Sequence, residues 1–171
     1  KLEEDDIVMV GSYYALNPVL RDKILELLDQ AREKRAIIYY DPNFRSSHKN
    51  EAMKLAPTII ENLEYADIVR GSLEDFLYMY NMQDKVSLRT NLVSKEYPIE
   101  PLEAVSTIGA GDNFNAGLIY GLLKYDVRYR DLNNLNEEIW DKIIQCGKDF
   151  AAEVCQSFSN SVSVEFAQKY K

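Results

Sequence analysis

The chain has 171 residues, of which 46% are hydrophobic and 28% charged, and its net charge is −8. This composition indicates a globular protein with one core. An acidic surface repels a phosphate backbone and no apolar stretch is long enough to cross a bilayer, so neither nucleic acid nor a membrane is an expected partner. No signal peptide is visible at the start of the sequence, and the two cysteines are spaced as separate reduced thiols, so we expect a cytoplasmic protein.

The first half of the chain alternates short apolar runs with helical patterns. The apolar runs are 7–10, 36–40 and 66–69, and helical spacing follows over 18–31, 51–65 and 73–80. Within the second of these helices, Pro57 marks either a kink or a new first turn. The alternation is the signature of βαβ units, so we predict an α/β fold with a mainly parallel sheet. The polar clusters 11–12, 41–45 and 71–72 should then gather at the carboxyl edge of that sheet.

The second half has a weaker pattern at first and then two helices. Residues 82–105 suggest a loop and an edge strand, and helices are expected from about 112 to 124 and from about 137 to 158. Cys146 and Cys155 lie in the latter helix, and their spacing favours separate reduced thiols over a disulfide. His48 is the only histidine, so neither a His-based metal cluster nor a Ser-His-Asp triad is favoured.

The strongest chemical signal is the run of small residues from Ser106 to Gly117, with a helix expected to start inside it. Free N–H groups at a helix start suit an anion, in particular a transferring phosphoryl group. Asp112 beside them is able to accept the proton of a hydroxyl. For a bare GxGD pattern, a helix cap at Asp112 with a tight glycine turn is favoured by roughly three to one. The dinucleotide fingerprint does not fit, because Phe114 stands where its third glycine belongs.

This segment resembles the signature D-T-x-G-A-G-D-x-F-x-A-G of the PfkB/ribokinase family of carbohydrate kinases. Members transfer the γ-phosphate of ATP to a hydroxyl of a sugar or a related small molecule. The resemblance implies a ribokinase-like three-layer α/β/α fold, an anion hole formed by Gly109, Ala110 and Gly111, and Asp112 as the catalytic base. A signature of this length makes the catalytic interpretation the better one, although Ser106 stands where the family usually has Asp.

Two further stretches resemble family motifs. The segment from Asp41 to Arg45 resembles D-x-N-x-R, which implies that Asp41, Asn43 and Arg45, together with Asn115, bind substrate or phosphate. For Arg45 alone, a surface residue on an Asn-containing turn is about equally favoured. Residues 66–75 resemble A-D-x-x-x-x-N-x-x-E, which organises Mg²⁺ and phosphate. Here Ser72 and Asp75 replace the Asn and Glu, so Asp75 is expected to act on the metal through water, and Ser72 is as well explained as a helix N-cap.

The resemblance also implies a set of nucleotide-binding residues: Ser72, Thr107, Gly147, Ala151 and Asn160. For the small residues of the last helix, close packing is favoured over a ligand by roughly three to one. Tyr13 and Tyr14 follow the first strand and are candidates for lining a sugar pocket, although simple packing explains them more readily.

Parts of a full family member are not in this sequence. We find neither the N-terminal region with its Gly-Gly motif and β-sheet lid nor a T-x-G-x-x-G loop between Asn81 and Pro101. Residues 1–171 are therefore expected to form a single α/β domain that is a fragment of a longer kinase chain, and the fragment alone need not be active. A homodimer, if formed through the lid as in the family, would depend on that absent region.

The resemblance thus implies an ATP- and Mg²⁺-dependent phosphotransferase that acts on a sugar: a fructose-like ketose, a pentose or a nucleoside. The alternative is a catalytically degenerate sugar- or nucleotide-binding module of the same fold, which Ser72, Ser106 and the missing nucleotide loop support. A dinucleotide-dependent oxidoreductase fits the βαβ pattern but lacks the fingerprint.

Overall fold

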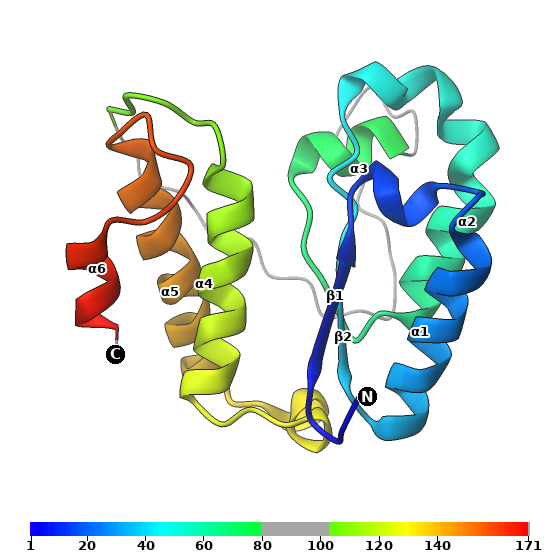
Figure 1. The fold of residues 1–171 in the computed structure, drawn as a ribbon, viewed down its shortest axis with the longest axis horizontal. Coiled ribbons are helices and arrows are strands. Elements are labelled where there is room, and N and C mark those ends of the chain that lie inside the picture. Colours follow the sequence, from blue (N-terminus) through cyan, green and yellow to red (C-terminus); the bar gives the residue numbers. More distant parts are fainter. Residues whose placement is uncertain (80–102, 171) are drawn as a thin grey trace. The chain divides into compact units, whose positions relative to one another are not determined.

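The computed structural model describes residues 1–79 and 103–170. It divides into two compact units, Lys1–Val93 and Ser94–Lys171, and each is described by itself (Figure 1). The predicted edge strand and the region searched for a nucleotide loop lie outside the described residues. That all 171 residues form a single domain stays a prediction.

The first unit is built on a parallel sheet in the order β1-β2-β3. The strands are β1 (Ile7–Gly11), β2 (Ile37–Asp41) and β3 (Ile68–Val69), as the three apolar runs predicted. Gly11 pairs with Asp41, and Tyr40 pairs with Val69, so the carboxyl ends of the strands lie level with one another. A Cβ on Gly11 would lie 2.4 Å from the Asp41 carbonyl oxygen, so this close strand pairing requires glycine.

Helices α1 (Arg21–Lys34) and α2 (Ala52–Tyr65) cover the same face of the sheet in Figure 1. The short helix α3 (Leu73–Met79) follows β3, and 3₁₀ turns η1 (Tyr13–Leu16) and η2 (Ser46–Glu51) follow β1 and β2. Two apolar clusters form the core of this unit. One comprises Val8, Ile24, Leu28, Ala31, Ala36 and Ile38; the other comprises Leu16, Phe44, Ala52, Leu55, Ile59 and Met79.

Two helix predictions for this unit need correction. The first helix begins at Arg21 rather than Pro18, because the preceding residues form turns in which the Leu20 amide donates to the Asn17 carbonyl. Val19 lies in this stretch and is 87% exposed, not part of an apolar face. The second helix runs through Pro57 without a break, so Pro57 does not begin a new helix.

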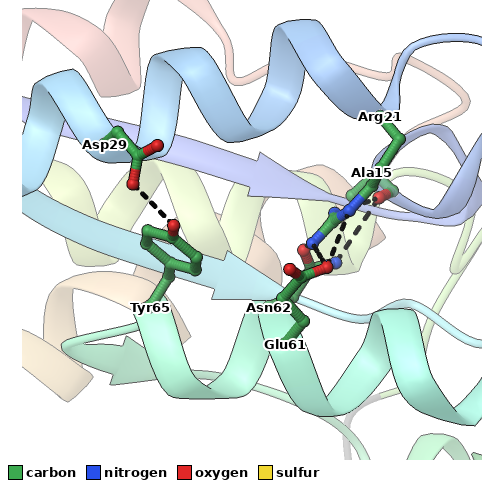
Figure 2. A network of polar contacts seen from close by, with 6 residues as sticks. All are labelled: Ala15, Arg21, Asp29, Glu61, Asn62 and Tyr65. Atoms are coloured by element: carbon green, nitrogen blue, oxygen red, sulfur yellow. Dashed lines mark hydrogen bonds and ion pairs between the residues drawn. The ribbon is translucent and has the colours of Figure 1, made fainter.

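A partly buried polar network joins α1, α2 and η1 (Figure 2). The Arg21 guanidinium donates to the Asn62 Oδ1 at 2.7 Å and forms an ion pair with Glu61. The Asn62 Nδ2 donates in turn to the Ala15 carbonyl at 3.4 Å. Because Ala15 lies in the turn that follows β1, this network fixes the chain at the carboxyl edge of the sheet.

The second unit is a helical pair with a short third helix. Its elements are α4 (Ala110–Lys124), η3 (Tyr129–Asn134), α5 (Glu137–Cys155) and α6 (Val164–Lys169). Along α4, Gly117 faces Cys146 and Gly121 faces Ile143, so α4 and α5 run antiparallel. A Cβ on Gly117 would lie 2.5 Å from the Cys146 carbonyl oxygen, which shows how closely the two backbones approach.

The sequence did not predict α6, and the end of α5 was placed too late. Because α5 ends at Cys155, Phe158 lies beyond it and is 85% exposed. Aromatic rings hold α6 instead: Phe166 stacks on Tyr170 and packs edge-on against Phe150. In the described part of the chain, no helix combines the length and the apolar character that a membrane span needs.

Both cysteines are buried and free, which confirms the predicted pair of separate thiols. Burial raises the pKa of the Cys146 thiol above its ordinary value, which disfavours the thiolate form.

Candidate functional site

The small-residue segment forms a tight turn that leads directly into α4. Gly109 is the N-cap residue of this helix, and its φ of 81° and ψ of −4° lie in the left-handed region that favours glycine. The Gly109 carbonyl accepts the Asn113 amide at 2.9 Å, and the Ala110 amide donates to the Thr107 carbonyl at 3.2 Å. The helix therefore begins at Ala110, which is two residues earlier than the sequence predicted.

The early start of α4 determines which amides face outward. Gly111 and Asp112 are the second and third residues of the helix, where no intrahelical carbonyl is available to accept their N–H groups. Neither amide bonds elsewhere within the described ranges 1–79 and 103–170. Two unpaired N–H groups at the positive end of a helix dipole suit an anion. Of the three predicted anion-hole residues, Ala110 has its amide occupied by the Thr107 carbonyl, whereas the amides of Gly109 and Gly111 have no bond among the described residues.

Asp112 projects from the third position of α4 and is exposed. The helix has no side-chain cap, so the alternative in which Asp112 caps it is wrong, whereas the tight glycine turn is confirmed. Among the residues that the structure describes, no hydrogen bond or ion pair engages the Asp112 carboxylate. The Asp112 carboxylate is thus available to act as a base, and the two free amides next to it are available to bind an anion.

Asn113 connects this turn to the loop that follows α5. Its Nδ2 donates to the Gly109 carbonyl at 2.9 Å and to the Asn160 carbonyl at 3.0 Å. The sequence gave no signal for this contact, since Asn113 occupies a variable position of the signature. Asn160 itself was predicted to bind nucleotide, and the structure places it against the Gly109 turn, where a Cβ on Gly109 would lie 3.5 Å from the Asn160 carbonyl oxygen.

The other predicted residues of this unit have mixed environments. Thr107 is exposed and Asn115 is 1% exposed. Gly147 is buried in the helix pair, where a Cβ would lie 3.1 Å from the Phe114 ring. Gly147 therefore has the packing role that its alternative interpretation favoured, and nucleotide-binding roles for Gly147 and Ala151 stay predictions.

In the first unit, Asp41 and Asn43 lie together at the end of β2. The Asp41 side chain is 5% exposed, lies 3.5 Å from the Arg70 guanidinium and accepts the Asn43 amide at 3.2 Å. Asn43 has a left-handed φ of 39°, whereas Arg45 is exposed at the start of η2. Burial and the nearby Asp41 charge raise the pKa of the Tyr39 hydroxyl, and Arg70 opposes this effect.

Ser72 and Asp75 meet at the start of α3. The Asp75 Oδ2 accepts both the Ser72 amide and the Ser72 hydroxyl at 2.7 Å, and the Asp75 amide donates to the Ser72 Oγ at 3.2 Å. This is a reciprocal helix cap, so the N-cap interpretation of Ser72 is confirmed. Within the described residues no group of three or more His, Cys, Asp or Glu side chains gathers. One carboxylate already engaged by Ser72 does not make a direct metal site, and a role of Asp75 through water stays a prediction.

The chain is similar to known kinases in sequence and in fold. Residues 90–167 match the family described as pfkB family carbohydrate kinase. A Pyrococcus horikoshii protein named as a putative sugar kinase is 28% identical over an alignment of 142 positions that covers 72% of this chain and 44% of that protein. Fructokinase from Vibrio cholerae, with fructose, ADP and calcium bound, aligns with a TM-score of 0.70 and 18% identity over 94% of this chain and 57% of its own.

A second solved structure has the same fold. Aminoimidazole riboside kinase from Salmonella enterica, complexed with aminoimidazole riboside and an ATP analogue, aligns with a TM-score of 0.73 and 16% identity over 98% of this chain and 63% of its own. The chain spans about half the length of these relatives. The family match over residues 90–167 and the relatives confirm the predicted resemblance to the pfkB family of carbohydrate kinases, and the solved structures show that the chain has the α/β fold of these kinases.

Proposed function

We propose that the chain is the nucleotide-binding part of a kinase that moves the γ-phosphoryl group of ATP to a hydroxyl of a sugar. The observation that carries this proposal is the exposed Asp112 carboxylate, which has no partner among the described residues and adjoins the free amides of Gly111 and Asp112. The family match supports the class of reaction. A pure binding site for an anion has no need of a carboxylate at this position.

In this proposal Asp112 takes the proton of the acceptor hydroxyl while the hydroxyl oxygen forms a bond to the γ-phosphorus. The bond between that phosphorus and the oxygen shared with the β-phosphate breaks, and its electron pair leaves with ADP. The amides of Gly111 and Asp112 stabilise the negative charge on the transferring group, and the Gly109 turn and Ala110 hold them in place.

The remaining predicted residues supply binding. Mg²⁺, when bound, neutralises charge on the β- and γ-phosphates, and Asp75 would hold it through water. We assign substrate and phosphate contacts to Asp41, Asn43, Arg45 and Asn115, and nucleotide contacts to Ser72, Thr107, Gly147, Ala151 and Asn160. The relatives named fructokinase and aminoimidazole riboside kinase support a ketose or a riboside as acceptor.

The test is ATP-dependent ADP release by the full-length parent protein that contains these residues, over a panel of ketoses, pentoses and nucleosides, beside its Asp112→Asn variant. We expect an acceptor-dependent rate that falls by about 10²- to 10⁴-fold in the variant. Asp126→Asn is a matched control, because it neutralises an exposed carboxylate just beyond the other end of α4. Equal rates in wild type and Asp112→Asn would remove Asp112 from the mechanism.

The alternative function is a binding module of the same fold without catalysis. The hydrogen bonds between Ser72 and Asp75 favour this binding module, because Asp75 is already engaged in a helix cap. Calorimetric titration with Mg·ADP and Mg·ATP separates the two functions. Binding of Mg·ATP by the longer chain that contains these residues, without turnover of any acceptor in the panel, would favour the module over the kinase.

A further inference from the structure

The side chain of Asn113 bridges two segments that are 47 residues apart in sequence. Its two Nδ2 hydrogens meet two backbone carbonyls, that of Gly109 at 2.9 Å and that of Asn160 at 3.0 Å. The bond to the Gly109 carbonyl is partly buried, whereas the bond to the Asn160 carbonyl is exposed. Among the hydrogen bonds of the described residues, this is the one side-chain bond that joins the Gly109 turn to the loop after α5.

The segment before the Gly109 turn is held from outside by the Val105 and Ser106 amides, which donate to the Cys155 carbonyl at 2.8 and 3.3 Å. The turn itself centres on Gly109. Its φ of 81° is strained for other residues, and the carbonyl of Gly109 is held by the backbone amide and the side-chain amide of Asn113 together. The orientation of the Gly109 peptide sets the direction in which the next amides of α4 point. A small rotation of this peptide would therefore turn the N–H groups of Gly111 and Asp112 away from a common target.

We propose that Asn113 is a positioning residue for phosphoryl transfer: its side-chain amide holds the Gly109 turn against the Asn160 loop and so keeps the first-turn amides of α4 aimed at the transferring group. Asn113 does not itself touch the phosphoryl group. The proposal rests on the proposed function, because it assigns the aim of those amides to catalysis.

Two substitutions distinguish the hydrogen-bond donation of the Asn113 side chain from the space that it fills. Asn113→Asp keeps the size of the side chain but replaces both N–H donors with acceptors, which would face two carbonyl oxygens. Asn113→Ala removes the side chain altogether. Asn136→Ala is the matched control, because it deletes the side-chain cap of α5, a 2.8 Å bond to the Glu138 amide, in the same unit but at another helix start.

With the acceptor found in the ADP-release panel, we expect kcat of Asn113→Asp and Asn113→Ala to fall by about 10- to 100-fold with little change in the KM for the acceptor. Asn136→Ala should keep wild-type kcat even where its thermal midpoint drops as far as that of Asn113→Ala. Wild-type kcat in Asn113→Asp would overturn the proposal. An equal fall of kcat in Asn136→Ala would do the same, since it would trace the effect to stability alone.

A second readout does not depend on turnover. In the ¹⁵N-labelled chain, the amide signals of Gly111 and Asp112 are followed by NMR before and after addition of Mg·ADP. We expect Asn113→Asp to shift both signals in the free protein and to weaken their response to Mg·ADP, whereas Asn136→Ala leaves both unchanged. Unshifted signals in Asn113→Asp would overturn the positioning role. A wild-type chain that does not respond to Mg·ADP would count against the proposed function, while the free-protein signals still decide the role of Asn113.

Discussion

Ser72 and Asp75 satisfy each other at the start of α3, where a single carboxylate oxygen of Asp75 accepts both the amide and the hydroxyl of Ser72. These are the two positions at which the chain departs from the Asn and Glu that the resemblance implied. The shorter hydroxyl and the shorter carboxylate fit one another as a helix cap, so the departure creates a local structural pair. This pair is therefore expected to stabilise the start of α3.

We predict that Ser72→Ala lowers the free energy of unfolding by about 1 kcal/mol, because it leaves the Asp75 amide without its Ser72 acceptor and Asp75 Oδ2 without a hydroxyl donor. Urea titration followed by circular dichroism measures this change. Glu74→Ala is the control, since Glu74 is exposed in the same first turn and should change stability by less than about 0.5 kcal/mol. A Ser72→Ala protein as stable as wild type would show that the cap contributes nothing.

Much of the fold was accessible from the sequence because apolar residues follow the period of each element. The runs 7–10 and 36–40 are β-rich and short, and both became strands of the parallel sheet. The short helix α6 has no such period: Val164 is 69% exposed, and ring contacts with Phe150 hold the helix. Such long-range contacts between aromatic residues leave no local pattern that sequence analysis can detect.

The candidate site, like the fold, could be predicted from the sequence only in part. The signature predicted the Gly109 turn and the place of Asp112, because both depend on a short run of small residues at the start of a helix. It did not predict the role of Asn113, whose acceptors are backbone carbonyls, one of them distant in sequence. Nor did it reveal that the Ala110 amide is used by Thr107, since this depends on the residue at which α4 begins.

The helix pair of the second unit depends on the absence of a side chain at Gly117. We predict that Gly117→Ala destabilises the protein by about 1–3 kcal/mol, because its Cβ would lie 2.5 Å from the Cys146 carbonyl and 2.8 Å from the Gly147 Cα. Both neighbours are backbone atoms, which cannot move without separating α4 from α5. Thermal unfolding and urea titration measure the loss.

Gly121→Ala is the graded comparison for this prediction. Its nearest neighbours are Ile143 atoms at 3.0 and 3.1 Å, one of them in a side chain that can shift, so a smaller loss is expected. The better helix propensity of Ala offsets part of the cost at both positions by about 1 kcal/mol. If Gly117→Ala proves more stable than Gly121→Ala, the two helices do not approach as closely at Gly117 as the structure shows.

Asn62 is the buried centre of the polar network between α1 and α2, and its side chain is 1% exposed (Figure 2). We predict that Asn62→Ala lowers the free energy of unfolding by about 1–3 kcal/mol, because the Arg21 guanidinium loses its 2.7 Å acceptor in a partly buried position. Tyr65→Phe is the matched control: it deletes a 2.6 Å bond to Asp29 that joins the same two helices in an exposed position. Water can replace that bond, so the control should lose less than about 1 kcal/mol. Urea titration of both variants decides the point, and equal losses would mean that burial of the network adds nothing to its strength.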